Sequence, residues 1–231
     1  MDKHAIASET ARLLLRIGAV HYNPHQPFFF TTGWASPVYI ECRRLISYPD
    51  FRRRITEYSL LGLQAALQQD GCDVVAGGES AGIPFAAWIA EKLNLPMVYI
   101  RKRPIGIGPN AQMEGDLRPG ARSLLVEDLT TDARSKINFC AALRQAGAVP
   151  KHISVIFSYG IFPGTEAMLA EQNLHLHALA DWQDVLRVAQ EDNAFDTATL
   201  RGIENFLADP VAWSASHGGI GNQAGIGKHG G

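Results

Sequence analysis

The sequence contains few cysteines. Only Cys42, Cys72 and Cys140 occur among its 231 residues, and no two of them form a Cys-x-x-Cys pair. An odd number without such pairing argues against a disulfide framework and against a cysteine-rich metal site. We therefore interpret the three thiols as small core residues of a protein from a reducing compartment, and we expect a cytoplasmic location.

Long hydrophobic runs and strong charge are also missing. The longest apolar stretches have the length of strands, so we expect no membrane partner. Residues 1–19 have the pattern of an amphipathic helix and lack the apolar region and cleavage site of a signal peptide. The net charge of −2 and the pI of about 6.4 exclude a strongly basic surface, so no nucleic-acid partner is predicted.

The eight histidines are scattered along the chain. His175 and His177 lie two apart in an expected strand and would share one face, but no third ligand stands near them in the sequence. This spacing favours a half-exposed strand face over a metal site.

Hydrophobic residues make up 46% of the chain, which is enough for one sizeable core. Short apolar strands alternate with segments of helical periodicity, and this alternation predicts an α/β fold with a central, mostly parallel sheet flanked by helices. Ligands of such sheets bind at the carboxyl ends of the strands. We expect strands at 74–76, 97–100, 123–126, 153–157 and 174–179, and helices at 4–18, 48–69, 84–93, 135–146 and 165–172.

The two ends of the chain differ from this pattern. Residues 28–40 are aromatic and β-branched around a Thr-Gly turn, which predicts a hairpin-like excursion. This excursion would belong to a small hood of about residues 1–45 on a single domain of residues 1–216. Residues 217–231 are rich in glycine, and no strand precedes their glycine pairs, so we expect a flexible tail without a function.

Residues 122–139 (RSLLVEDLTTDARSKINF) carry the strongest chemical signal. An expected buried strand ends in two carboxylates, Glu127 and Asp128. A hydroxyl-bearing loop follows, and a helix then begins with Ser135 as its N-cap. The free N–H groups of a helix start suit a phosphate, and the carboxylates could bind sugar hydroxyls. The segment 124–136 therefore predicts a site for a ribose 5-phosphate.

Spacing alone does not separate this interpretation from an ordinary strand–turn–helix unit with an acidic capping region. However, the segment resembles the phosphoribosyl pyrophosphate (PRPP) motif of phosphoribosyltransferases. Three further stretches resemble, in family order, parts of orotate phosphoribosyltransferases: the amino-terminal substrate segment at 30–47, the pyrophosphate-loop strand and helix at 75–87, and the mobile catalytic loop at 99–115. The resemblance extends from about residue 28 to residue 162.

This resemblance implies a type I phosphoribosyltransferase fold and an enzyme of pyrimidine biosynthesis. Such an enzyme joins orotate to PRPP, releasing pyrophosphate and forming orotidine 5′-monophosphate. Mg²⁺ would be held largely by PRPP, without a direct protein ligand, and a homodimer would share the loop 101–115 across its interface. Because charge develops on the sugar and on the leaving group, positioning and charge stabilisation would suffice without a covalent nucleophile.

The resemblance also assigns residues by position. The catalytic group would be Arg101, Lys102, Arg103 and Asp128. PRPP would be bound by Glu127, Asp128, Leu129, Thr130, Thr131, Asp132, Ala133, Arg134 and Ser135. The pyrophosphate loop would be Glu79, Ser80, Ala81 and Gly82, and orotate would contact Tyr39, Ile40, Thr131 and Tyr159.

Several positions depart from the family pattern. The mobile loop usually carries a lysine and often a histidine or an aromatic residue where this chain has Ile105 and Ile107. Small residues, commonly glycines, usually stand at Ala133 and Arg134, and Tyr159 replaces a basic residue that often contacts orotate. A lost charge stabiliser commonly costs about 3 kcal/mol of barrier. These departures favour a second hypothesis, a catalytically impaired paralogue that binds PRPP or a nucleotide in a regulatory role. A third, a purine phosphoribosyltransferase, is disfavoured by the SPVYIECR stretch.

Overall fold

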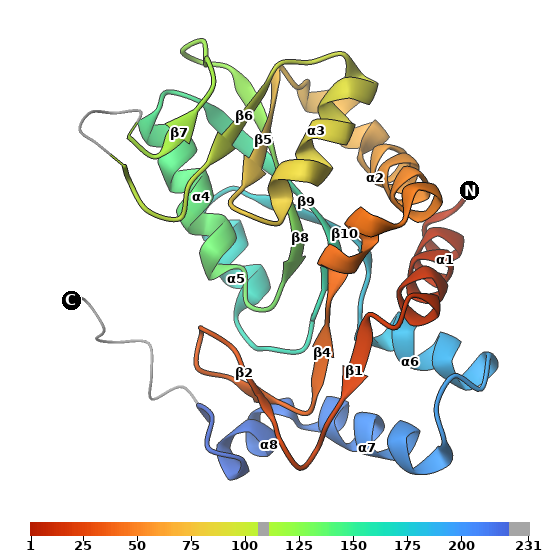
Figure 1. Ribbon diagram of the computed structural model, residues 1–231. Coiled ribbons are helices and arrows are strands. Elements are labelled where there is room, and N and C mark those ends of the chain that lie inside the picture. Colours follow the sequence, from red (N-terminus) through yellow and green to blue (C-terminus); the bar gives the residue numbers. More distant parts are fainter. Residues whose placement is uncertain (106–110, 222–231) are drawn as a thin grey trace.

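The computed structural model describes residues 1–105 and 111–221, and its centre is a six-stranded sheet (Figure 1). The strands follow the order β10-β9-β8-β5-β6-β7, and every neighbouring pair is parallel except β6 and β7. The prediction of an α/β fold with a mostly parallel sheet is confirmed. The strands are β5 Val74–Gly78, β6 Met97–Ile100, β7 Met113–Glu114, β8 Arg122–Thr130, β9 Val149–Ser158 and β10 His175–Ala180.

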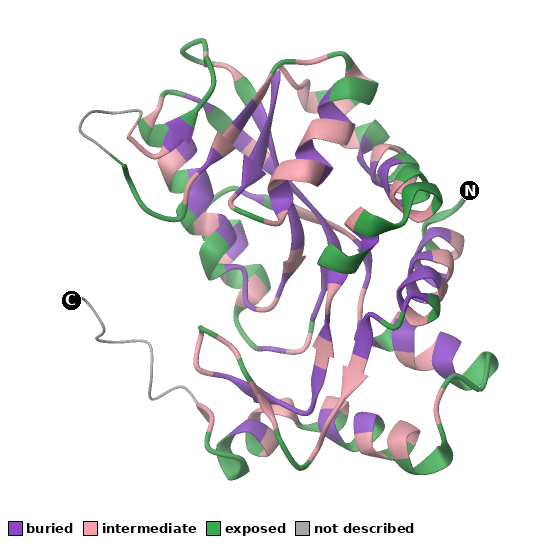
Figure 2. Cartoon of the chain, in the orientation of Figure 1, coloured by how far each residue is buried: buried purple, intermediate pink, exposed green. Residues whose placement is uncertain are grey.

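Helices cover both faces of the sheet, because successive side chains of a strand point to opposite sides. Along β8, Leu124 and Val126 join one hydrophobic cluster and Leu125 joins the other. Side chains of α1, α2, α3 and α6 join the first cluster, together with buried residues of the segments 19–45 and 203–206. Side chains of α4 and α5 join the second cluster, so the strands are buried between two layers (Figure 2). The helices are α1 Lys3–Arg16, α2 Pro49–Asp70, α3 Gly82–Leu93, α4 Arg134–Gln145, α5 Thr165–Glu171 and α6 Trp182–Glu191.

A small hood built from short antiparallel ribbons forms its own pairs of strands (Figure 1). It shares the first hydrophobic cluster with the sheet, to which it contributes Trp34, Val38 and Ile40. The last two helices of the described chain pack against it, and the buried Ser214 hydroxyl accepts a hydrogen bond from the backbone N–H of Ala35 at 3.0 Å. Helix α1 packs against β10 and α6, on the sheet side of the hood. The hood elements are β1 Val20–Tyr22, β2 Phe28–Phe29, β3 Ala35–Ser36, β4 Val38–Ile40 and the 3-10 helix η1 Cys42–Ser47. The two helices that pack against it are α7 Thr197–Ala208 and α8 Pro210–Ser216.

The glycine-rich stretch begins with contacts to this hood. The backbone N–H of Ile220 donates to the carbonyl of Gly33 at 2.9 Å, and the Ile220 carbonyl accepts from the Ser214 hydroxyl at 2.7 Å. Residues 217–221 are thus placed by the hood. Residues 222–231, where we expect a flexible tail, lie outside the described residues.

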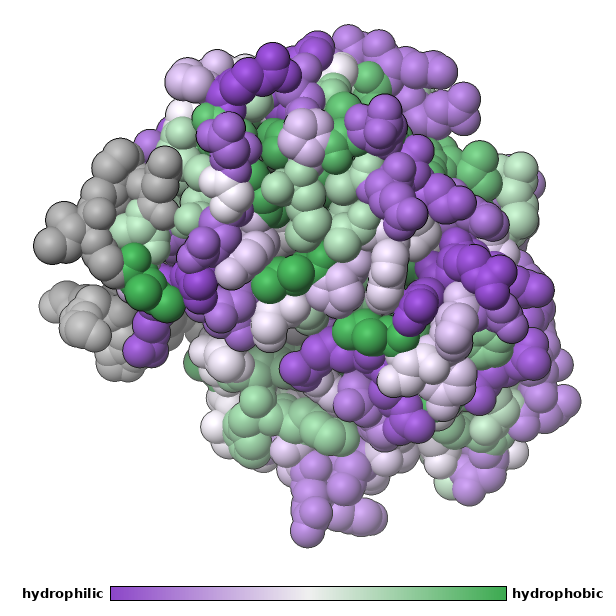
Figure 3. All heavy atoms as spheres, turned by 45° about the horizontal axis from the view of Figure 1, so that its top comes forward, coloured by the Kyte–Doolittle hydropathy of each residue, from purple (hydrophilic) through white to green (hydrophobic). Residues whose placement is uncertain are grey.

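The surface carries no extended apolar band on the face shown in Figure 3, where hydrophobic residues form separate patches between hydrophilic ones. Among the helices of the described residues, none is both long enough and apolar enough to cross a membrane.

Polar side chains gather at the amino-terminal ends of β9 and β10. The two ring nitrogens of His152 lie 3.0 Å from His177 Nε2 and 3.0 Å from Asp70 Oδ2, and the His175 ring lies on the same face. Within residues 1–105 and 111–221, no three His, Cys, Asp or Glu side chains are grouped to hold a metal ion. Burial lowers the pKa of His177 to about 4, and the neighbouring His152 acts in the same direction.

We expect His177 to weaken the fold in acid. Its pKa in the folded state lies below the ordinary value of about 6.5, so as pH falls the unfolded chain binds the proton first. Stability that is present above about pH 6.5 is therefore lost between about pH 6.5 and pH 4. In urea unfolding, His177→Gln should lose less stability over this range than the wild type. The nearby His152, His175, Asp70 and Lys3 are the same in both proteins, so equal losses would contradict the assignment to His177.

Candidate active site

A cleft of about 560 Å³ lies between the hood and the carboxyl ends of the central strands. This edge of a parallel sheet is where α/β proteins bind their ligands. Its walls come from the loop after β5, the segment after β6, the end of β8 with the start of α4, and the hood. The lining residues are Phe29, Phe30, Thr31, Thr32, Tyr39, Arg43, Glu79, Ser80, Ala81, Lys102, Gln112, Glu127, Asp128, Leu129, Thr131, Ser135, Lys136, Asn138, Phe139 and Tyr159.

A larger hollow of about 950 Å³ lies beside α5 and β10. Its ionisable lining residues are Glu166, His175 and His177, so it offers neither lysine nor arginine to an anion. The 560 Å³ cleft instead gathers three cationic and three acidic side chains within one concave surface. Convergent charge of both signs makes this cleft the better candidate for a phosphorylated ligand.

The two predicted carboxylates lie in the floor of the cleft. Strand β8 continues to Thr130, so Glu127 and Asp128 belong to the strand itself instead of following it. Glu127 accepts hydrogen bonds from the backbone N–H of Gly82 at 3.1 Å and from Lys136 Nζ at 2.9 Å. Asp128 Oδ1 accepts from the backbone N–H of Leu129 at 2.9 Å. Glu127 is therefore held on both oxygens, whereas Asp128 keeps Oδ2 available to a ligand.

Electrostatics distinguish this acid pair from surface carboxylates. Both side chains are buried, and burial raises the pKa of both carboxyls, while the positive charge of Lys136 acts in the opposite direction. Lys136 Nζ lies 2.9 Å from Glu127 Oε2 within this buried part of the cleft. Lys136 therefore lets the cleft hold two adjacent acids while offsetting one of their charges.

The loop after β8 turns sharply before α4. Ala133 has a φ of 63°, in the left-handed region that favours glycine, and its N–H donates to the Thr130 hydroxyl at 3.0 Å. The expectation that glycine would suit this position is consistent with that backbone. The predicted N-cap at Ser135 is wrong, because the turn at Ala133 makes Arg134 the first helical residue. The Arg134 guanidinium lies beside Asp132, 3.5 Å from its Oδ2, and does not line the cleft.

The pyrophosphate-loop residues are tied to both neighbouring strands. Glu79 Oε2 accepts a hydrogen bond from the backbone N–H of Lys102 at 2.7 Å, which ties the segment after β6 to the loop after β5. Gly82 packs so closely on β8 that an added Cβ would lie 2.2 Å from the carbonyl oxygen of Val126. A glycine is therefore required where the loop meets the acid-bearing strand.

The basic cluster after β6 divides into different environments. Lys102 lines the cleft, whereas the Arg101 guanidinium binds Glu114 at 2.7 Å and lies outside the lining. Arg103 is exposed and outside the lining, and Ile105 is 66% exposed. Ile107 lies outside the described residues.

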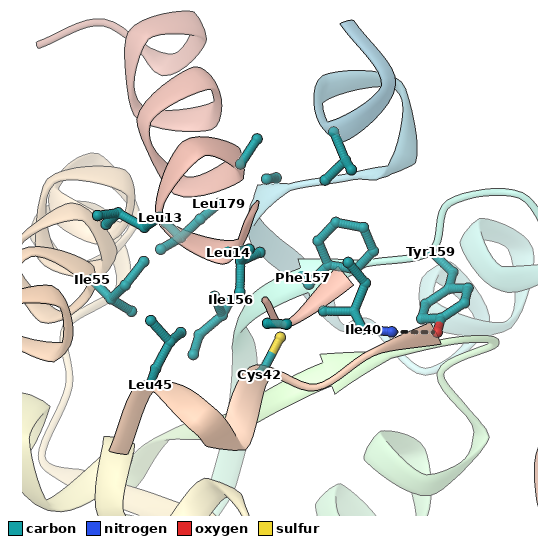
Figure 4. Packing of buried hydrophobic residues seen from close by; sticks show 14 of the residues in the cluster. Leu13, Leu14, Ile40, Cys42, Leu45, Ile55, Ile156, Phe157, Tyr159 and Leu179 are labelled. Carbon is teal, nitrogen blue, oxygen red and sulfur yellow. Dashed lines mark hydrogen bonds between the residues drawn. The ribbon is translucent and has the colours of Figure 1, made fainter. Parts of the chain in front are cut away.

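The hood closes the other side of the cleft with aromatic residues. Tyr39 lines the cleft, and its ring stacks on Phe28 with centroids 5.3 Å apart. Tyr159 lines it from the end of β9, and burial raises the pKa of its hydroxyl well above the usual range. Ile40 is buried in the core, and its N–H donates to the Tyr159 hydroxyl at 3.3 Å (Figure 4).

The structure thus brings most of the sequence-predicted residues together. The predicted residues that line the cleft are Tyr39, Glu79, Ser80, Ala81, Lys102, Glu127, Asp128, Leu129, Thr131, Ser135 and Tyr159. Those outside its lining are Ile40, Gly82, Arg101, Arg103, Thr130, Asp132, Ala133 and Arg134.

Sequence reasoning missed two cations of the lining, Arg43 and Lys136. Arg43 stands within the substrate segment 30–47, and Lys136 is the last residue of the predicted phosphate segment, so both were within reach of the motifs. The two adjacent acids could have revealed them. Glu127 and Asp128 are buried, and buried negative charges need a nearby cation.

Comparisons with known proteins agree on one family. The chain is 49% identical to the orotate phosphoribosyltransferase of Dinoroseobacter shibae over 216 residues, which are 94% of this chain and 96% of the relative. It is 48% identical to that of Rhizobium rhizogenes over 221 residues, 95% of this chain and 94% of the relative. No family model matches the chain.

Solved structures give the same result. The orotate phosphoribosyltransferase of Aeropyrum pernix superposes with a TM-score of 0.67 at 26% identity, covering 80% of this chain and 99% of that one. The Leishmania donovani UMP synthase superposes with a TM-score of 0.74 at 25% identity, covering 87% of this chain and 42% of that one. Its longer chain contains a region with the fold described above.

Proposed function

The chain belongs to the orotate phosphoribosyltransferase family, and on this premise we propose that it transfers the phosphoribosyl group of PRPP to orotate. The products are orotidine 5′-monophosphate and pyrophosphate, in pyrimidine biosynthesis. The observation that carries the proposal is the single cleft in which the acid pair of β8, the start of α4 and the pyrophosphate loop converge under the hood.

In this mechanism the side chains position charge and form no covalent intermediate. The free oxygen of Asp128 accepts from the ribose hydroxyls, and the amides at the start of α4 bind the 5′-phosphate. Lys102 lines the cleft next to Glu79. In the proposed mechanism its charge stabilises the negative charge that develops on the leaving pyrophosphate. Catalysis then rests on orientation and electrostatic stabilisation of a sugar that becomes positive in the transition state.

Mg²⁺ fits this site as a companion of the substrate. Magnesium sites often use one or two carboxylates together with substrate phosphates and water. The cleft offers Asp128 with one free oxygen, while both oxygens of Glu127 are already bonded. Bound on PRPP, Mg²⁺ would neutralise part of the pyrophosphate charge, and Asp128 would act on the complex through the ribose hydroxyls.

We further propose that the protein acts in the cytoplasm as a homodimer in which the loop 101–115 of one subunit reaches the cleft of the other. Arg103 is exposed and lies outside the cleft lining of its own chain, so it is accessible to a neighbouring subunit, whereas Arg101 is paired with Glu114. Sedimentation analysis of the full chain, which separates a monomer of 25.2 kDa from a dimer, tests the assembly.

The activity is tested by the ultraviolet absorbance of orotate. With PRPP and Mg²⁺ present, the absorbance should fall as orotate is consumed, and omission of PRPP should abolish the change. A wild type that binds PRPP yet never consumes orotate would contradict the enzyme proposal and favour a regulatory, PRPP-binding role.

We expect Ile105→Lys to raise turnover by about ten-fold, equivalent to about 1.4 kcal/mol of barrier. The side chain is largely exposed on the catalytic-loop segment, so the ammonium can be introduced without burial. Its charge would act mainly on the leaving pyrophosphate, so kcat should rise more than PRPP affinity. Leu61→Lys, at an exposed apolar position on α2 outside the cleft, is the matched control. An equal gain in both variants would show a general effect of charge.

A further inference from the structure

The proposed base, orotate, differs from uracil by one carboxylate. A binding site that prefers the carboxylated base needs a cation near the base, because a carboxylate is costly to desolvate without one. Tyr159, at the end of β9, cannot provide that charge, because burial raises the pKa of its hydroxyl and leaves it neutral. The cation must therefore come from another element of the cleft.

Three cations line the cleft among the described residues, and two of them are already assigned. Lys136 is buried against Glu127, with Nζ 2.9 Å from Oε2. Lys102 follows β6 and lies beside the pyrophosphate loop, where its backbone is bound by Glu79. The remaining cation is Arg43, which belongs to the hood.

Arg43 is free to bind an anion. Within the described parts of the chain, no carboxylate oxygen lies within 4.0 Å of its guanidinium, whereas the adjacent Arg44 lies 3.9 Å from Glu41 Oε2. Arg44 is also outside the cleft lining. The two neighbouring arginines therefore differ in two features that affect anion binding: Arg43 lines the cleft and has no carboxylate partner among the described residues, whereas Arg44 lies outside the lining and is near Glu41.

The orientation of Arg43 is set by the aromatic wall. Its Nη2 donates to the hydroxyl of Tyr39 at 3.3 Å, and the Tyr39 ring is stacked on Phe28. Tyr159 lines the same cleft, and its hydroxyl accepts a hydrogen bond from the N–H of Ile40, the residue after Tyr39 in β4. A guanidinium held in this way retains donors for a planar carboxylate, which it can bind in a bidentate manner.

We propose that Arg43 binds the carboxylate of the pyrimidine substrate and thereby makes the site selective for a carboxylated base. The proposal rests on the proposed transfer to orotate and adds the residue that determines specificity. Lys136 and Lys102 then serve the ribose and pyrophosphate ends, while Arg43 serves the base.

The test compares Arg43→Met, Arg43→Lys and the control Arg44→Met in steady-state kinetics. Arg43→Met should raise the KM for orotate by about 10- to 100-fold, the range expected when one charge-assisted contact is lost. The KM for PRPP should change by less than about two-fold, because the lost contact binds only the base and makes no contact with PRPP. Arg43→Lys should recover part of the loss, and Arg44→Met should behave as the wild type.

The preference for orotate over uracil provides a second measurement. A purely structural role of Arg43 would not change this preference. Uracil lacks the carboxylate, so Arg43→Met should use uracil as well as the wild type does, and the preference for orotate over uracil should fall by the same 10- to 100-fold factor. An unchanged preference, or an equal loss with both bases, would overturn the assignment of Arg43.

Failure of the proposed function would be distinguishable from failure of this inference. A wild type with normal orotate turnover and an Arg43→Met variant with the same KM would leave the function intact and refute the role of Arg43. If the wild type does not turn over at all, the proteins are compared by calorimetric titration with orotidine 5′-monophosphate. Equal affinities of wild type and Arg43→Met for orotidine 5′-monophosphate would then refute the inference. A lower affinity in Arg43→Met but not in Arg44→Met would support it.

Discussion

Replacing Lys136 with methionine is expected to lower the free energy of unfolding by about 3–5 kcal/mol, because the buried carboxylate of Glu127 loses its cation. The Lys136 and Glu127 side chains are only 6% and 8% exposed, so water cannot replace the ion pair. Methionine keeps a similar unbranched chain and limits the change in packing. Urea unfolding of both proteins at neutral pH measures the difference.

Two controls separate the loss of charge from the loss of packing. Burial raises the pKa of Glu127, and the carboxyl loses its opposing cation in the variant, so the variant should regain relative stability as pH falls and Glu127 is protonated. Adding Glu127→Gln to Lys136→Met removes the unpaired charge and should restore much of the stability. A loss that is independent of pH and persists in the double variant would assign the effect to packing.

Asp128→Asn is expected to weaken PRPP binding by roughly 1–3 kcal/mol, about 5- to 150-fold, without unfolding the protein. The carboxylate lines the cleft, and only Oδ1 has a backbone partner, Leu129. The amide can keep that backbone contact through its own oxygen, while it loses the negative charge that attracts the ribose hydroxyls. Calorimetric titration with PRPP measures the change in affinity.

The control for this variant is Asp116→Asn, an exposed aspartate outside the cleft lining. It removes the same charge from the protein without removing a ligand, so its PRPP affinity should equal that of the wild type. Unchanged affinity in a folded Asp128→Asn variant would contradict the placement of the ribose at this carboxylate.

Most of the central sheet could be predicted because its strands are short apolar runs separated by helical periodicity. The expected strands lie within β5, β6, β8 and β9. The expected strand 174–179 differs from β10 by one residue at each end. The two-residue strand β7 carries no such local signal, because it exists only through its pairing with β6. Helix α6 was missed although Asp181 forms a capping box at its start, a pattern that the sequence does contain.

The strand, loop and helix of residues 122–139 could be predicted because they are contiguous in the chain. Their details could not. The first residue of α4 depends on the left-handed backbone of Ala133, and a propensity argument favours a serine cap instead. Arg101 resembled a cleft cation, but β7 places Glu114 beside it, and that ion pair depends on the pairing of two strands.

By itself, the amino-acid sequence determined the fold class, the family and the segment that carries the acid pair, because periodicity and contiguous motifs are local properties. Only the tertiary structure decided which charges meet. Glu127 binds Gly82, 45 residues away, and Ile40 binds Tyr159, 119 residues away. Such contacts exist because packing brings the strand ends and the hood to one place, where buried polar groups must find partners. The same packing leaves Arg43 facing the cleft beside Tyr39, and no local pattern records that position.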